Sequence, residues 1–262
     1  MTAMAHGSEI DQARRVSFDA RAELYDAVRP SYPDALADDV LSRAGRRVLE
    51  IGPGTGKATV VFARRGASIV AVEPGASLAA VLRRNVAGLD VTVENTTFEA
   101  WPIARPFDVV MAAQAIHWVD PRVRYVKAAA ALVPGGTLAV IRNEALPLED
   151  GLQGEIDAAY ARWPIRTREP LIDDVVEATR RELVGEIDAS GRFGAVDLRV
   201  YPWTTTYTAA RYLDLLDTYS DHAILAPDHR ASLHQAIADA IERRGGAVEL
   251  RYVSMAFLAP RA

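Results

Sequence analysis

The clearest chemical pattern in the chain is a glycine-rich stretch, Glu50-Ile51-Gly52-Pro53-Gly54-Thr55-Gly56, that follows an apolar run. Glycines let the backbone turn sharply and let a ligand approach closely, and a helix that starts after the turn offers free N–H groups. A dinucleotide-binding loop has the pattern G-x-G-x-x-G. Here the pattern is G-x-G-x-G, and Lys57 stands where the third dinucleotide glycine would be. This spacing suits a cofactor with a methionine tail and no phosphate better than a pyrophosphate.

An acidic residue ends the next apolar run, Ile69-Val70-Ala71-Val72-Glu73. Glu73 follows the glycine stretch at roughly 20 residues, where a dinucleotide fold carries the acid that binds the ribose hydroxyls. The same position would serve the ribose of NAD or of S-adenosylmethionine (SAM), so Glu73 supports an adenosyl cofactor without choosing between them. The alternative is an acid that merely ends a strand.

The glycine stretch and Glu73 must be positioned by secondary structure. In the first half of the chain, short apolar segments alternate with segments of helical periodicity. Strands that alternate with helices predict a parallel sheet with helices on both faces. The expected strands are 47–51, 68–73, 91–94, 107–112 and 137–142, the last preceded by a turn at 134–136. The expected helices are 18–28, 34–44, 59–65, 77–87 and 121–132.

The alternation ends after residue 146. The segment 147–191 is mainly helical in pattern, with Trp163-Pro164 as an interruption. Strands are expected at 196–207, where β-branched and aromatic residues gather, and at 249–258, with helices at 209–219 and 228–244. The two late strands would complete a seven-stranded sheet, and the helices between strands five and six would cap its carboxyl edge. The predicted fold is therefore a doubly wound α/β sheet, mostly parallel, with a small helical cap.

Five segments together resemble the class I SAM-dependent methyltransferases. Residues 48–59 are similar to motif I of that family, and Glu73 is similar to the motif II acid. Thr97-Phe98-Glu99-Ala100-Trp101-Pro102 resembles the adenine loop, with Thr97 where that loop more often carries Asp. Segments 107–110 and 132–138 resemble motif IV and the turn into strand five. The resemblance implies SAM as cofactor, held by Tyr25, Arg29, Glu50, Gly52, Pro53, Gly54, Gly56, Glu73, Pro74, Thr97, Phe98 and Gln114.

Two further segments resemble the trans-aconitate methyltransferase-like group of small-molecule enzymes. They are Tyr25 with 29–33, and Ala115-Ile116-His117-Trp118-Val119-Asp120. This resemblance implies an acceptor that is methylated on a carboxyl or hydroxyl oxygen. It implies that Tyr25 and Arg29 fold over the cofactor, with Arg29 facing a carboxylate; the alternative is a pair of surface residues. His117, Trp118 and Tyr32 are the predicted substrate-binding residues.

His117 carries the one catalytic role that we predict from the sequence. It follows the fourth strand, at the carboxyl edge where ligands bind in open α/β sheets. There it could act as a general base or could position the acceptor. The alternative is a structural histidine packed beside Trp118.

Composition narrows the classes of function. The chain has 262 residues, no cysteine and a formal net charge of −5. Disulfides, thiolate metal sites and a cysteine nucleophile are therefore excluded, and binding of nucleic acid over the whole surface is disfavoured. No metal site is expected, because none of His222, His229 and His234 lies four residues from another as an H-x-x-x-H pair requires. We expect a soluble cytoplasmic protein, since no apolar stretch approaches the roughly 20 residues of a membrane span.

The expected organisation has four parts. They are N-terminal helices over the cofactor cleft (1–45), a SAM-binding Rossmann-like core (46–146), a helical cap insertion (147–192) and the last two strands with their helices (193–262). Three other functions stay open: a nicotinamide-dependent oxidoreductase, a nucleic-acid methyltransferase and a SAM-binding protein without catalysis. The missing third glycine disfavours the first. The absence of an Asp/Asn-Pro-Pro-aromatic motif after strand four and of cysteine disfavours the second. The acceptor and the oligomeric state are left open.

Overall fold

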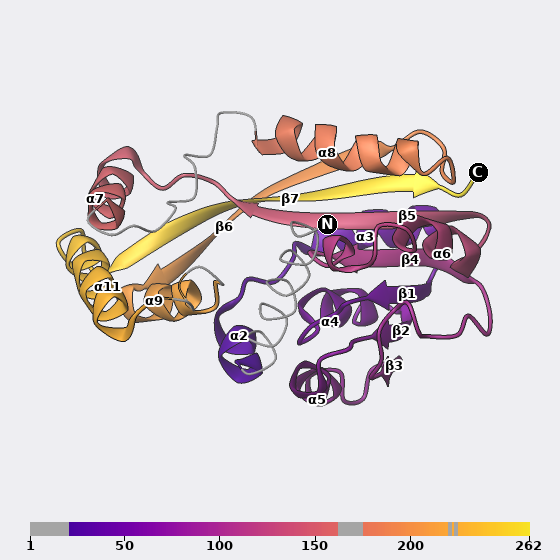
Figure 1. The fold of residues 1–262 in the computed structure, drawn as a ribbon, viewed down its shortest axis with the longest axis horizontal. Helices are drawn as coiled ribbons and strands as arrows, with labels where there is room; N and C mark the ends of the chain where they lie inside the picture. Colours follow the sequence, from indigo (N-terminus) through magenta and orange to yellow (C-terminus); the bar gives the residue numbers. More distant parts are fainter. Residues whose placement is uncertain (1–20, 162–174, 220–221, 223–224) are drawn as a thin grey trace, which may run out of the picture.

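A computed structural model describes residues 21–161, 175–219, 222 and 225–262. The described residues form a seven-stranded sheet with strand order β3-β2-β1-β4-β5-β7-β6 (Figure 1). The first five strands run parallel, β7 is antiparallel to β5, and β6 is antiparallel to β7. The strands are β1 (Arg47–Ile51), β2 (Ser68–Val72), β3 (Val91–Glu94), β4 (Phe107–Ala113), β5 (Leu132–Ala145), β6 (Asp197–Thr208) and β7 (Ala247–Pro260).

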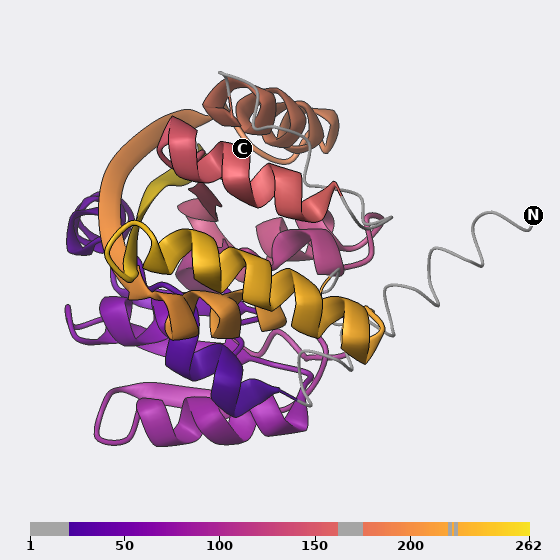
Figure 2. The ribbon, with the colours of Figure 1, turned by 90° about the vertical axis from the view of Figure 1, so that its left-hand side faces the viewer.

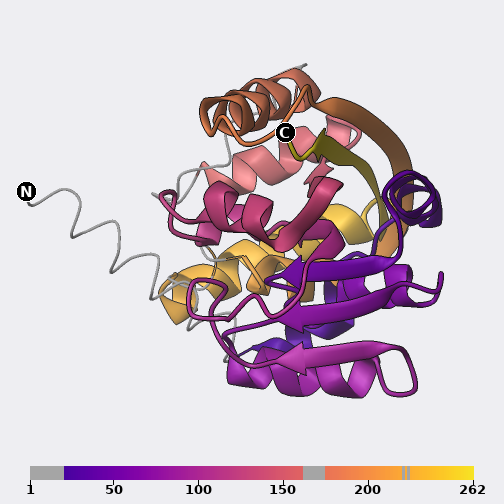
Figure 3. The ribbon, with the colours of Figure 1, turned by 90° about the vertical axis from the view of Figure 1, so that its right-hand side faces the viewer.

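Helices cover both faces of the sheet. On one face, α3, α4 and α5 pack their apolar sides against strand residues such as Val48 and Val109. On the other face, α6 and α8 pack against residues such as Val110 and Phe257. In Figure 3, α3 and α8 lie on opposite sides of the sheet. These helices are α3 (Asp34–Ala44), α4 (Lys57–Ala63), α5 (Ala76–Asn85), α6 (Arg124–Ala131) and α8 (Val175–Ala189). The prediction of a doubly wound, mostly parallel α/β fold is confirmed.

A third apolar cluster lies where β5, β6 and β7 extend beyond the rest of the sheet. It joins Val28 of the N-terminal helix to α7, α9 and α11 and to strand residues such as Tyr207 and Leu250. Figure 2 shows these helices across the end of the sheet at which β5 ends. The helices are α2 (Ala22–Val28), α7 (Asp150–Tyr160), α9 (Ala209–Asp217) and α11 (Pro227–Glu242). The segment predicted as a cap insertion thus contributes α7 to this end of the sheet and α8 to a face.

The predicted elements differ from the structure mainly at their ends. Residues 134–136 do not form a separate turn, because β5 begins at Leu132 and its pairing with β4 shifts register there instead. Gly135 lies in this shifted stretch and adopts the left-handed conformation, at φ 73°, that such a break in register favours. The first predicted helix is described from Ala22 on, and its residues 18–20 lie outside the described part, as does Trp163-Pro164. Among the described residues, no helix is both long and apolar enough to cross a bilayer.

Candidate functional site

The glycine loop joins the end of β1 to the start of α4. Gly52, Gly54 and Gly56 have φ angles of 63°, 61° and 92°, a region that favours glycine. A Cβ atom on Gly52 would lie 2.7 Å from the Cβ of Ala115, and one on Gly56 would lie 2.4 Å from Cδ1 of Leu82. A Cβ on Gly54 would meet no atom within 4 Å. The loop is therefore closely packed at its two ends and open at Gly54, where a ligand can approach the backbone.

Glu73 ties this loop to the end of β2. Its side chain is almost fully buried. Its Oε2 accepts a hydrogen bond from the Gly54 amide at 2.9 Å, and its Oε1 accepts one from the Gly75 amide at 2.8 Å. Asn95, which the sequence did not single out, donates from Nδ2 to the carbonyl oxygens of Glu73 and Pro74 at 2.8 and 3.1 Å. The acid at the tip of β2 thus also orders the backbone on which a cofactor would rest.

Beneath the loop lies a buried carboxyl group. Glu50 has no exposed surface, and neither of its side-chain oxygens has a hydrogen-bond partner among the described residues. Burial raises the pKa of Glu50 to about 8, and the neighbouring Glu73 charge adds to this rise against the opposing effect of the Thr59 hydroxyl. The hydroxyls of Thr55 and Thr59 are also buried and make no hydrogen bond of normal geometry, although each lowers the pKa of a nearby acid, Asp26 and Glu50 respectively. A buried polar group without a full hydrogen bond costs roughly 1–3 kcal/mol, so the Glu50 carboxyl beneath this loop is a candidate partner for a polar ligand.

Gln114 follows β4 in a left-handed backbone conformation, at φ 55°. Its backbone amide donates to the Ile141 carbonyl at 2.9 Å, and its side-chain Nε2 donates to the Asn143 carbonyl at 2.7 Å. A non-glycine residue in this region is strained by roughly 1–2 kcal/mol, and such strain gathers at functional sites. The two bonds to β5 hold the strained turn, and the turn directs the chain into the short helix η1 (Ile116–Trp118).

His117 and Trp118 lie on that short helix, with ring centroids 4.8 Å apart. Nδ1 of His117 lies 3.2 Å from Nη1 of Arg142, near the end of β5. Arginine can only donate, so Nδ1 accepts and the neutral ring carries its proton on Nε2. The same Nη1 donates to Oε1 of Gln114 at 3.4 Å. The sequence missed Arg142 because it lies within an expected strand and far from His117 along the chain.

Arg29 and Tyr25 lie together at the end of α2, and their contact with the cofactor stays a prediction. Nε of Arg29 donates to Oγ1 of Thr218 at 2.8 Å, and Nη2 donates to the Thr218 carbonyl at 3.0 Å. The Arg29 guanidinium lies over the rings of Tyr25 and Tyr219, at 5.0 and 4.3 Å from their centroids. Arg29 thus connects α2 to the end of α9. Tyr32 packs against the apolar cluster on the face that carries α3 and α4. Burial, followed by the charges of Tyr25 and Glu50, raises the pKa of its phenol.

The predicted adenine residues occupy a turn after β3. Thr97 is exposed, and its Oγ1 accepts from the Ala100 amide at 3.2 Å. Phe98 is buried in the core, and the Lys127 ammonium lies 5.3 Å from its ring centroid. Thr97 therefore stabilises the turn, whereas Phe98 anchors it. A contact of either residue with adenine stays a prediction.

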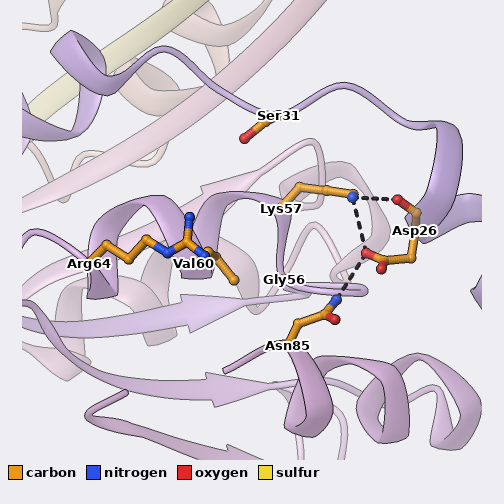
Figure 4. Close-up of a pocket in the computed structure, with 7 residues that line it drawn as sticks. All are labelled: Asp26, Ser31, Gly56, Lys57, Val60, Arg64 and Asn85. Carbon is orange, nitrogen blue, oxygen red and sulfur yellow. Dashed lines mark hydrogen bonds and ion pairs between the residues drawn. The ribbon is translucent and has the colours of Figure 1, made fainter. Parts of the chain in front are cut away.

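A pocket of about 250 Å³ lies beside the end of the glycine loop at Gly56, between the N-terminal segment and α4 (Figure 4). Within it, the Lys57 ammonium pairs with Oδ1 of Asp26 at 3.1 Å, and Asn85 donates to the same oxygen at 3.0 Å. The Lys57 charge is thus paired with an internal acid. The pocket is lined by Asp26, Ser31, Gly56, Lys57, Val60, Arg64 and Asn85.

Part of this chain, which includes the glycine loop, matches a known protein family. Residues 48–136 match the family described as a methyltransferase domain. An uncharacterised methyltransferase of Mycobacterium tuberculosis is 42% identical over 130 residues, which are 49% of this chain and 52% of that protein. A ubiquinone biosynthesis O-methyltransferase of Nitrobacter winogradskyi is 36% identical over 99 residues, which are 37% and 38% of the two chains.

The similarity of fold extends further than the similarity of sequence. A solved structure of a candidate type II methyltransferase from Anaeromyxobacter dehalogenans covers 88% of this chain and 97% of its own, with a TM-score of 0.64 at 23% identity. The matched stretch spans about half the length of the most similar curated relatives. Residues 48–136 thus match a methyltransferase domain in sequence, and the described residues share the fold of a solved methyltransferase structure.

Proposed function

We propose that this protein is an enzyme that transfers a methyl group from SAM to a carboxylate or hydroxyl oxygen of a small molecule. The observation that carries this proposal is the unpaired, fully buried carboxyl of Glu50 beneath a glycine loop that is open at Gly54. An amino acid ammonium is the complement of such a carboxylate, and SAM carries one at its methionine end.

Three features of the loop would hold the cofactor. Glu50 would accept hydrogen bonds from the ammonium, and Gly54 lets the cofactor approach the backbone closely. Glu73 would accept hydrogen bonds from the ribose hydroxyls while it keeps the loop in place. When bound, SAM supplies a methyl group that its positive sulfur already activates for attack by the acceptor oxygen, with S-adenosylhomocysteine as the product. The protein then contributes chiefly proximity and alignment.

The arrangement of His117 favours a positioning role. Since Nδ1 accepts from Arg142, the neutral ring carries its proton on Nε2 and has no lone pair with which to take a proton from the acceptor. A carboxylate acceptor brings no proton that must be removed, so it needs no base. A hydroxyl acceptor would need His117 to exchange its tautomer or its partner first.

The printed names of the relatives support an oxygen atom as the methyl acceptor, but they do not indicate which molecule carries it. The Nitrobacter relative is an O-methyltransferase by its printed name, and the trans-aconitate methyltransferase-like resemblance implies a carboxylate or hydroxyl. The net charge of −5 agrees with a small-molecule acceptor rather than nucleic acid. The lack of cysteine agrees with a cytoplasmic location. The oxidoreductase alternative is disfavoured by Lys57 in place of the third dinucleotide glycine.

Calorimetry tests the cofactor. SAM and S-adenosylhomocysteine should bind, and NAD and NADP should give no heat. Tighter binding of a nicotinamide cofactor would overturn the proposal. Release of S-adenosylhomocysteine in a screen of small acids and alcohols then separates an enzyme from a SAM-binding protein without catalysis.

A further inference from the structure

We propose that Arg142 recognises a carboxylate of the acceptor, which makes this protein a methyltransferase for organic acids. The proposal rests on the proposed function and names the substrate class of the same site. Arg142 lies near the carboxyl end of β5, one residue beyond Ile141, which pairs with the last residue of β4. It therefore lies at the sheet edge where open α/β folds bind their ligands.

The guanidinium is held in place by neutral groups. Its Nη1 contacts Nδ1 of His117 at 3.2 Å and Oε1 of Gln114 at 3.4 Å. Its Nε is buried and has no partner among the described residues. The side chain is 13% exposed. A cation this shielded from water gains much from a carboxylate, and Nη2, which faces Glu182, is the donor that such a ligand would meet.

The acid that the structure pairs with Arg142 is Glu182 of α8, and this pair is weak. Nη2 of Arg142 lies 3.8 Å from Oε1 of Glu182, whose side chain is 63% exposed. An ion pair at that distance with one exposed partner contributes little to stability. A ligand carboxylate could therefore replace Glu182 at small cost. His117 lies beside the guanidinium, with its Nδ1 3.2 Å from Nη1.

Position distinguishes an acceptor carboxylate from the carboxylate of SAM itself. The glycine loop follows β1, and β4 lies between β1 and β5. Two strand spacings separate β1 and β5 by about 10 Å. Glu50, the expected partner of the methionine end, packs with Thr59 on the face that carries α4, whereas Arg142 contacts α8 on the opposite face. Arg29, for which the sequence predicts a carboxylate partner, donates to Thr218 in this structure.

The experiment measures acid binding by calorimetry to the full chain saturated with S-adenosylhomocysteine. The probes are acetate, benzoate, succinate and trans-aconitate. The primary amide of each acid is measured as its uncharged control. The variants are Arg142→Gln, Glu182→Gln and Arg199→Gln. Arg199 is the matched control, because it also pairs with an acid, Asp197 at 2.8 Å, but lies on the edge strand β6. SAM affinity is measured separately for each variant.

We expect at least one acid to bind the wild type more tightly than its amide. Arg142→Gln should weaken that acid about ten- to a hundredfold, the loss of a charge-assisted hydrogen bond. Glu182→Gln should leave the affinity equal or raise it, and Arg199→Gln should not change it. The proposal is overturned if no acid is preferred over its amide, if the preference survives Arg142→Gln, or if Arg142→Gln lowers SAM affinity instead. Failure of the wild type to bind SAM would overturn the proposed function separately.

Discussion

The carboxyl edge of the sheet has two halves that are built in different ways. The half at β1 and β2 holds the glycine loop through backbone amides and one buried acid, Glu73. The half at β4 and β5 brings together long side chains from separate elements, with Arg142 bonded to His117 and Gln114 and facing Glu182. The first half depends on backbone conformation within one stretch of chain. The second depends on which side chains the packing brings into contact.

The two halves also differ in how their polar groups are satisfied. In the first half, the acid Glu50 and the hydroxyls of Thr55 and Thr59 are buried and make no hydrogen bond of normal geometry. In the second half, the cation Arg142 already has neutral partners and a distant acid. The comparison indicates that a cofactor would complete the first half, whereas an acceptor would replace an existing weak pair in the second. The predictions below test this difference, beginning with the largest expected effect.

Substitution in the glycine loop should abolish SAM binding. Gly54→Ala puts a Cβ into the open space of the loop at φ 61°, a strain of roughly 1–2 kcal/mol. Gly52→Ala adds a contact of 2.7 Å with Cβ of Ala115, so its free energy of unfolding should fall further. Urea unfolding and SAM calorimetry measure both effects. If Gly54→Ala binds SAM like the wild type, the opening at Gly54 is not the cofactor site.

Glu73→Ala should lower SAM affinity by about tenfold to a hundredfold. The variant loses the acceptor for the Gly54 and Gly75 amides and for the ribose, and hydrogen bonds to a charged group contribute roughly 1.5–3 kcal/mol. Glu94→Ala, at the exposed end of β3, is the matched control. Calorimetry gives the affinity and circular dichroism checks the fold. An unchanged affinity would leave Glu73 as an acid that merely ends its strand.

SAM affinity should rise with pH up to about 8, the pKa of Glu50. Below that pH the free protein holds Glu50 protonated, and binding an ammonium must release the proton, so affinity should increase about tenfold per pH unit. Glu50→Gln should remove this slope. Calorimetry in buffers of different ionisation enthalpy measures the released proton, and a flat profile for the wild type would contradict an ammonium at Glu50.

The same shift predicts how the free protein responds to pH. The folded pKa of Glu50 is above its ordinary value of 4.5, so between 4.5 and about 8 the folded state binds more protons than the unfolded state. The contribution of this group to stability is therefore present below 4.5 and is lost as the pH rises toward 8. Urea unfolding of the wild type and of Glu50→Gln at several pH values measures the difference.

His117→Ala should leave SAM affinity unchanged and raise KM for the acceptor about two- to tenfold, the contribution of one neutral hydrogen bond. Its Nδ1 is bonded to Arg142, which supports positioning over proton transfer. Steady-state release of S-adenosylhomocysteine separates the two parameters. A fall of roughly 10²–10⁴-fold in kcat at unchanged KM would instead identify His117 as a general base.

Arg29→Ala should leave SAM affinity unchanged, which is the smallest effect predicted here. The variant loses the bonds to Thr218 and the contacts with Tyr25 and Tyr219, so the free energy of unfolding should fall by about 1–2 kcal/mol. Arg211→Ala is the matched control, because Arg211 also connects α9 to α2 through the Ala27 carbonyl. Weaker SAM binding in Arg29→Ala alone would restore the cofactor role that the sequence predicted.

The sequence by itself determined the order of strands and helices and the place of the cofactor loop. The segments 34–44, 47–51 and 91–94 match α3, β1 and β3 residue for residue. Hydrophobic periodicity and proline act over a few residues, so they can be recognised without knowing the fold. The glycines of the loop are equally local, because each is required by the backbone angle at its own position.

Only the tertiary structure decided which side chains meet. It placed Arg29 on Thr218, Phe98 inside the core and Arg142 beside His117. These partners lie many residues apart, and nothing in the local pattern distinguishes one arginine from another as the neighbour of a given histidine. Their contacts follow from strand register and helix packing, which depend on the whole chain. The acceptor half of the site therefore had to be found in the structure.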